Sequence, residues 1–284
     1  MKTIEFPNRE TWPALGLGTW HLGEAASRRA AEVAAVRVAL EIGYRVFDSA
    51  EMYGEGGAEE VLGEALAGAV RAGVVTRDEV FVVSKVYPHN ASRGGVAAAC
   101  RRSLQRLGLD RIDLYLLHWR GAVPLADTLA GFVDLQRTGH IRHWGVSNLD
   151  LSDMEELSRL PGGDACATDQ VYYALAERGP EFDLLPWLRG RRIPLMAYSP
   201  LDQGALAGDR TLAAIGERHR ASAAQVALAW VLAQPGVMAI PQSARERHLR
   251  DNYAAASLEL TQRDLDEIDR HHPSPKRATP LAMR

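Results

Sequence analysis

Short apolar runs alternate along the chain with longer stretches in which apolar residues recur at helical spacing. The runs end in polar residues and lack the strict alternation of a half-exposed strand, as is typical of buried parallel strands. This pattern predicts eight β-strands with helical sequence between them. In chain order they read LGLGTW, RVFDS, VFVVSK, IDLYLLH, IRHWGVSN, CATDQ, IPLMAYSP and VMAIPQS.

The intervening stretches carry start and stop signals of helices. Val96, Cys100 and Leu104 fall on one face of a helix that Gly108 is expected to end with a left-handed cap. The stretch SAAQVALAWVLAQPG begins with a capping Ser and is stopped by a Pro-Gly pair. A further helix is expected to bury Leu125, Leu129, Phe132 and Val133.

Eight strands, each followed by helical sequence, fit a single (β/α)8 TIM barrel spanning residues 1–284. Residues 1–14 are expected to form a hairpin that closes the barrel bottom, and residues 272–284 an irregular tail. A doubly wound sheet is the rival fold. GLGTW offers only G-x-G without a third Gly before a helix, which is a weak match to a dinucleotide fingerprint.

Charge and composition exclude several classes of function. Lys and Arg total 33 against 36 Asp and Glu, so the net charge is −3 and favours neither nucleic acid nor an anionic membrane. The first residues lack the apolar core of a secretory signal, and no apolar run approaches the ~20 residues of a membrane span. The two cysteines have no metal-binding spacing, so we expect no metal site and a cytoplasmic protein.

Polar residues stand at the ends of the predicted strands, which in a barrel meet at one mouth. Singly, each has an ordinary explanation, since Asp caps helices, Lys is solvated and His is hydrogen-bonded in cores. Together, Asp48, Lys85 and His118 would be carried into one half-buried ring, with Tyr53 in the loop after Asp48. The other strand ends contribute Thr19, Trp20, Ser147, Asn148, Asp169, Gln170, Tyr198, Ser199, Gln242 and Ser243.

Together, the side chains of Asp48, Tyr53, Lys85 and His118 suggest acid catalysis at a carbonyl group. A free Tyr has a pKa near ~10, and a neighbouring ammonium is expected to lower the pKa of Tyr53. Asp48 would hold Lys85 charged, and His118 would orient or polarise the carbonyl oxygen. Such a site needs a hydride source, which no side chain supplies.

These motifs resemble the aldo-keto reductase superfamily, and within it bacterial members that reduce methylglyoxal and related aldehydes. The resemblance rests on FDSAEMYG, VVSKVYP and LYLLHW, with GLGTW, HIRHWGVSNL, ATDQVYY, AYSPL and IPQS…DN as further matches. It covers nearly the whole chain. It implies reduction of small aldehydes or ketones with NADPH, NADH being the other possible cofactor, by a monomer. The catalytic residues would be Asp48, Tyr53, Lys85 and His118.

The resemblance also implies binding roles. The nicotinamide carboxamide would bind Ser147, Asn148 and Gln170, and Tyr198 would stack on the nicotinamide ring. Ser199, Leu201 and the loop DQGALAG would cover the pyrophosphate. The substrate would meet Trp20, Tyr87, His118 and Trp119. Further cofactor contacts are expected from Gly18, Thr19, Trp20, Asp48, Ser243, Arg245, His248 and Asn252.

The chain departs from the family pattern around the expected adenosine site. Gln242 stands where many members have a Lys that meets the 2′-phosphate, and His248 stands where many have an Arg. Ser243 is expected to open a helix on which Arg247 and Arg250 share a face while Arg245 points elsewhere. The loop after AYSPL and the tail are short, which suggests an open pocket.

Three other functions remain open at this stage. The same site can run physiologically in the direction of alcohol oxidation, or the barrel can serve as a cofactor-binding regulatory subunit with little turnover. A barrel hydrolase would need paired carboxylates at strand ends, for which only Asp48 and Asp169 qualify.

Overall fold

A computed structural model describes residues 2–7 and 9–284. Its eight-stranded sheet runs in the order β10-β9-β8-β7-β6-β5-β4-β3, and every pairing in it is parallel. The strands are β3 (Leu17–Gly18), β4 (Val46–Asp48), β5 (Phe81–Val86), β6 (Ile112–Leu117), β7 (Ile141–Ser147), β8 (Asp169–Tyr172), β9 (Leu195–Tyr198) and β10 (Val237–Ala239).

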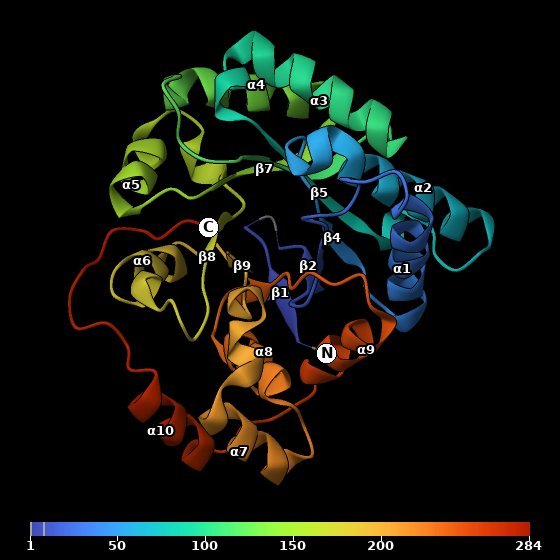
Figure 1. The fold of residues 1–284 in the computed structure, drawn as a ribbon. Helices are drawn as coiled ribbons and strands as arrows, with labels where there is room; N and C mark the ends of the chain where they lie inside the picture. Colours follow the sequence, from blue (N-terminus) through green and yellow to red (C-terminus); the bar gives the residue numbers. More distant parts are fainter. Residues whose placement is uncertain (1, 8) are drawn as a thin grey trace.

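The sheet closes on itself. Parallel bridges join Leu15 to Ala239 and Gly18 to Gln242, and the backbone N–H of Gly16 donates to Ala239 O over 2.9 Å. Viewed along the barrel axis, the strands lie at the centre and the helices form a ring around them (Figure 1). The prediction of a (β/α)8 barrel is confirmed, and the doubly wound alternative is excluded.

Ten α-helices and six short 3₁₀ helices connect the strands within the described residues. The α-helices are α1 (Arg29–Ile42), α2 (Gly57–Arg71), α3 (Arg93–Leu107), α4 (Leu125–Arg137), α5 (Leu151–Arg159), α6 (Leu184–Gly190), α7 (Arg210–His219), α8 (Ala223–Ala233), α9 (Glu246–Ala255) and α10 (Gln262–His271). The 3₁₀ helices are η1 (Tyr53–Gly56), η2 (Arg77–Glu79), η3 (Pro88–Asn90), η4 (Gly163–Ala165), η5 (Gly179–Glu181) and η6 (Asp202–Gly208).

The two ends of the chain cover opposite ends of the barrel. β1 (Thr3–Glu5) and β2 (Thr11–Pro13) pair as an antiparallel hairpin. Trp12 of this hairpin packs against Phe81, the first residue of β5, with ring centroids 4.9 Å apart. Residues 1 and 8 of the expected hairpin lie outside the described residues. The tail after α10 has no regular structure, passes α6 and ends beside β8 (Figure 1).

Helix burial follows the sequence pattern with one exception. Val96, Cys100 and Leu104 of α3 are buried, and Gly108 ends that helix at φ 63°. Val133 of α4 was predicted to be buried with its neighbours, but it is 45% exposed. The prediction was wrong because Val133 is rotated about 100° from Phe132 around the helix, which places it at the edge of the face that α4 buries.

Candidate active site

The carboxyl ends of three neighbouring strands bring the four predicted catalytic residues together. Asp48 ends β4, Lys85 lies near the end of β5, His118 follows β6, and Tyr53 opens η1. The Lys85 ammonium donates to Asp48 Oδ2 over 2.7 Å and to the carbonyl of Ser49 over 2.9 Å. Its nitrogen also lies 3.2 Å from the Tyr53 hydroxyl oxygen. One ammonium thus joins the carboxylate to the phenol.

Burial sets the protonation of this group. The Lys85 side chain is 0% exposed, and this burial lowers the pKa of Lys85. The charge of the nearby Asp48 carboxylate partly opposes that lowering. Burial, and then the charge of Asp48, raises the pKa of Tyr53 well above its usual value of 10. The expectation that Lys85 gives Tyr53 a lowered pKa was therefore wrong, because desolvation of the phenolate outweighs the ammonium. Tyr53 holds its proton throughout the neutral range.

His118 is neutral. Burial, and then the charge of Lys85, lowers the pKa of His118 well below 6.5. The His118 ring meets the Tyr53 ring edge-on, with centroids 5.7 Å apart. A neutral imidazole carries one N–H, so His118 can donate one hydrogen bond to a carbonyl oxygen held beside Tyr53.

Asp48, Tyr53 and His118 face a large cavity at the barrel mouth, with a volume of about 1290 Å³. Most of the predicted site residues line it. They are Gly18, Trp20, Asp48, Tyr53, His118, Trp119, Ser147, Asn148, Gln170, Tyr198, Ser199, Leu201, Ser243, Arg245, His248 and Asn252.

Three predicted site residues do not line the cavity. Lys85 lies behind Asp48 and Tyr53. Thr19 is fully buried and its hydroxyl donates to the Asp48 carbonyl over 3.0 Å, so it supports β4. Tyr87 meets Trp119 edge-on at 5.9 Å, and therefore backs a wall residue without forming the wall.

Polar side chains on one wall form a connected set. Gln170 Nε2 donates to Asp48 Oδ1 over 2.8 Å, and Asn148 Nδ2 donates to the His118 carbonyl over 3.1 Å. The Tyr198 hydroxyl donates to Asn148 Oδ1 over 2.9 Å. Asn148 has a φ of 58°, a left-handed conformation that its neighbours must maintain. This wall presents amide donors and acceptors, which suit recognition of a carboxamide.

Asp169 does not join this wall. Successive strand residues point to opposite faces, so Gln170 enters the cavity while Asp169 turns outward and is fully buried. Burial raises the pKa of Asp169 well above its usual value. The structure does not bring Asp48 and Asp169 together as the paired carboxylates that a hydrolase would need.

The segment before α9 differs from its prediction. Ser243 does not open the helix, because α9 begins at Glu246 and the Ser243 hydroxyl accepts a hydrogen bond from the Arg245 N–H over 3.1 Å. Arg245 and Arg247 line the cavity, whereas Arg250 does not and instead pairs with Glu246 over 2.7 Å. The expected grouping of Arg247 with Arg250 was therefore wrong.

Sequence reasoning missed several residues of the cavity. Arg28 and Glu32, at the start of α1, line it, and so do Met283 and Arg284 from the tail. The Arg284 N–H donates to the Tyr198 hydroxyl over 3.2 Å, and its guanidinium pairs with Asp202 over 2.8 Å. The place of Arg28 after the first strand offered a signal, but nothing local marks residue 284 as part of the mouth.

The described part of the chain shows neither a metal-binding cluster nor a membrane-spanning helix. No group of three His, Cys, Asp or Glu side chains among residues 2–7 and 9–284 is arranged to hold a metal ion. Within the same residues, no helix has the length and apolar character needed to cross a bilayer.

Comparison with known proteins places this geometry in a family. Residues 14–273 match the model of the aldo/keto reductase family. The chain belongs to that family. It is 48% identical to methylglyoxal reductase YeaE of Escherichia coli (strain K12), with 99% of each chain covered. It is 36% identical to glyoxal reductase of Bacillus subtilis (strain 168), covering 94% of this chain and 91% of that one.

A solved structure shows the same fold. An aldo-keto reductase from Klebsiella pneumoniae, crystallised in complex with NADPH, superposes with a TM-score of 0.94 at 45% identity. The alignment covers 100% of this chain and 99% of the other. The prediction of an aldo-keto reductase is confirmed, and the alternative hypotheses of a hydrolase and of a doubly wound sheet are rejected.

Proposed function

We propose that this aldo-keto reductase reduces small aldehydes to alcohols, with NADPH as cofactor and Tyr53 as proton donor. The observation that carries this function is the buried Lys85 ammonium, which contacts both the Asp48 carboxylate and the Tyr53 hydroxyl from behind the cavity wall. Relatives that share the whole chain length are named methylglyoxal and glyoxal reductases, which supports a small aldehyde as substrate.

The residues of this chain divide the work. Bound NADPH supplies the hydride. As negative charge grows on the substrate oxygen, Tyr53 gives up its proton and His118 donates an N–H to the same oxygen. The Lys85 ammonium, 3.2 Å away, stabilises the phenolate that remains. Asp48 keeps Lys85 charged and in place.

The cavity walls fit a nicotinamide cofactor. Ser147, Asn148 and Gln170 offer amide and hydroxyl groups for the carboxamide, and Tyr198 offers a ring face for stacking. Ser199, Leu201 and part of η6 line the same cavity, and we propose that they cover the pyrophosphate. Gly18, Trp20, Ser243, Arg245, His248 and Asn252 are further proposed contacts to the cofactor, and Thr19 supports them through Asp48.

We predict a preference for aldehydes over matched ketones. Trp20, Trp119, Met283 and Arg284 line the cavity that contains Tyr53 and His118. Benzaldehyde and acetophenone differ by one methyl group on the carbonyl carbon, and one such group changes kcat/KM by about 10-fold or more in a fitted pocket. Initial rates of NADPH consumption with both compounds and with methylglyoxal measure this. Faster turnover of a steroid-sized ketone than of any small aldehyde would contradict it.

We also predict that NADPH binds more tightly than NADH despite Gln242. The 2′-phosphate needs positive charge, and Arg245, which lines the cavity, has no ion pair within the described residues. A charge-assisted hydrogen bond contributes about 1.5–3 kcal/mol, which corresponds to about 10- to 100-fold in Kd. Arg245→Gln should weaken NADPH binding by that factor and leave NADH binding unchanged.

Arg250→Gln is the matched control, because Arg250 pairs with Glu246 outside the cavity. Kd values for both cofactors, from quenching of tryptophan fluorescence, decide the matter. Equal affinity of the wild-type protein for NADH and NADPH would mean that the loss of the usual Lys at Gln242 is decisive.

We propose that the protein works as a cytoplasmic monomer. Both cysteines are buried thiols, and burial raises the pKa of Cys100 to about 12, so neither is poised for exchange. Light scattering after size-exclusion chromatography measures the molecular mass in solution.

Turnover of a panel of aldehydes distinguishes an enzyme from a regulatory subunit. Comparing the rates of aldehyde reduction and alcohol oxidation at neutral pH shows the favoured direction.

A further inference from the structure

The turn that carries Tyr53 is conformationally strained. Gly54, Glu55 and Gly56 follow Tyr53 with φ values of 56°, 53° and 94°. Left-handed backbone suits Gly, but Glu55 carries a side chain and keeps this conformation only if the surrounding structure imposes it. Contacts with the surrounding structure must therefore maintain this turn.

Glu51 holds the turn on one side. It lies two residues before Tyr53, and its side chain is 4% exposed. One carboxylate oxygen accepts from the Tyr87 N–H over 2.8 Å and from Asn90 Nδ2 over 3.0 Å. The other accepts from Arg102 of α3 over 3.0 Å. Glu51 thus ties the turn to the end of β5 and to the outer helix layer.

Glu59 holds the turn on the other side. It lies in the first turn of α2, six residues after Tyr53, and is fully buried. One oxygen accepts from the Ser84 hydroxyl over 2.6 Å, and the other from Arg106 of α3 over 3.1 Å. Ser84 directly precedes Lys85, so the hydrogen bond fixes the strand segment from which the ammonium projects.

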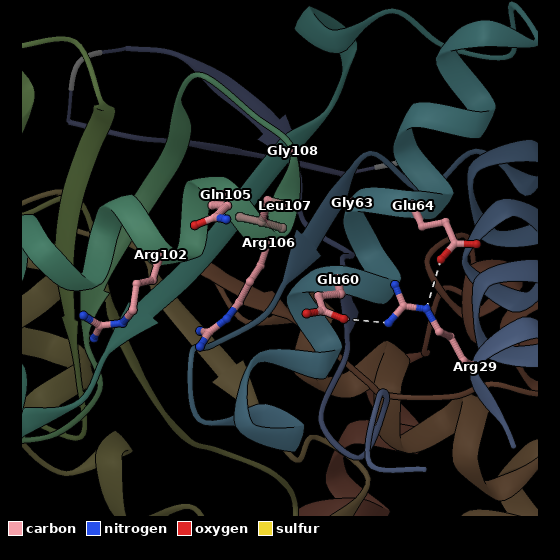
Figure 2. A pocket seen from close by; sticks show the side chains of 9 residues that line it. All are labelled: Arg29, Glu60, Gly63, Glu64, Arg102, Gln105, Arg106, Leu107 and Gly108. Atoms are coloured by element: carbon pink, nitrogen blue, oxygen red, sulfur yellow. Dashed lines mark hydrogen bonds and ion pairs between the residues drawn. The ribbon is translucent and has the colours of Figure 1, made fainter. Parts of the chain in front are cut away.

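Arg102 and Arg106 approach these carboxylates from one face of α3. They are four residues apart, and Figure 2 shows both side chains extending from α3 in the same direction. They line an outer cleft of about 600 Å³, separate from the catalytic cavity. Helices α2 and α3 meet closely at Gly63 of α2, where an added Cβ would lie 2.4 Å from the Leu107 carbonyl oxygen of α3. This contact brings the arginines within reach of α2.

We propose that Arg102 and Arg106 are positioning residues. Through Glu51 and Glu59 they fix Tyr53 and Lys85 at the distance at which the proton moves. The inference rests on the proposed role of Tyr53 as proton donor. Neither arginine lines the catalytic cavity, so their effect is on the rate of the chemical step and not on binding.

Electrostatics gives a readout that a purely structural role would not move. Lys85 faces Asp48, Tyr53, Glu59 and His118, and the charges of Asp48 and Glu59 both oppose the lowering of its pKa by burial. Glu59→Gln keeps the side chain's size but removes one of these charges. The pKa of Lys85 then falls further, so reduction is lost at lower pH than in the wild type.

The experiment measures kcat, KM and the pH profile for methylglyoxal reduction, with Kd for NADPH. Arg102→Gln and Arg106→Gln should each lower kcat by about 10-fold, since small misplacements of reacting groups have effects of that size or larger. KM and Kd should stay within about twofold of wild type, because the binding walls are intact. Arg106→Lys should restore most of kcat, and the exposed Arg101→Gln on the same helix is the control.

Ser84→Ala covers the case in which the arginine variants fail to fold. It removes only the hydroxyl between Glu59 and the strand carrying Lys85, and should lower kcat severalfold. Native kcat and pH profile in Ser84→Ala and Glu59→Gln would overturn the proposal while leaving Tyr53 as the donor. Native kcat in folded Arg102→Gln and Arg106→Gln would do the same. An active Tyr53→Phe enzyme would overturn the proton-donor assignment, and this proposal with it.

Discussion

Tyr53→Phe is expected to lower kcat for aldehyde reduction by about 10²-fold or more, the usual contribution of a positioned general acid. The substitution removes one hydroxyl, which lies 3.2 Å from the Lys85 nitrogen. The high pKa of Tyr53 keeps this hydroxyl protonated at neutral pH and ready to donate. Cofactor binding should barely change, because the ring remains in place.

The control is Tyr115→Phe. That hydroxyl is buried on β6, where the ring packs edge-on against Phe132 and away from the cavity. Steady-state rates and the Kd for NADPH are measured for both variants. Near-native kcat in Tyr53→Phe would remove Tyr53 from the mechanism.

Lys85→Met is expected to lower kcat by about 10²–10³-fold, as loss of a group that stabilises transition-state charge does. Without the ammonium, the phenolate formed in the reaction has no cation beside it. The barrel should stay folded, since Asp48 keeps its hydrogen bond from Gln170 over 2.8 Å. Thermal unfolding checks this, and the exposed Lys276→Met serves as the control.

The pH profile of Lys85→Met carries a second expectation. Burial lowers the pKa of Lys85 and raises that of Tyr53, so Lys85 is the first of the two to lose its proton as pH rises. Reduction needs the ammonium, so wild-type activity is present below the pKa of Lys85 and falls as pH rises through it. Lys85→Met should lack this alkaline decline and stay slow at every pH. An unchanged rate and profile would show that Lys85 has no catalytic part.

The fold and the catalytic group were predictable because they follow from local patterns. Buried runs ending in polar residues define parallel strands, and the barrel places all strand ends at one mouth. Asp48, Lys85 and His118 therefore had to converge once eight strands were recognised. The protonation of Tyr53 was not predictable in the same way, because its pKa depends on how deeply the phenol is buried.

Features that depend on contacts between distant segments escaped prediction. Arg284 reaches the cavity only because the tail folds back onto β8 and β9, which no local pattern encodes. Tyr87 follows a strand end as Trp119 does, but its ring packs edge-on against Trp119 and does not line the cavity. Glu51 and Glu59 look like ordinary surface acids in the sequence, and only the packing of α3 beside them brings Arg102 and Arg106 into contact with their carboxylates.

Consumption of NADPH by the purified wild-type protein in the presence of methylglyoxal is the most direct test of the central claim. The absorbance of NADPH is followed at increasing methylglyoxal concentrations, and the alcohol product is quantified in the same samples. We expect a saturable rate and one molecule of alcohol for each NADPH oxidised. A rate that does not exceed the background without protein, for methylglyoxal and for other small aldehydes, would contradict the account.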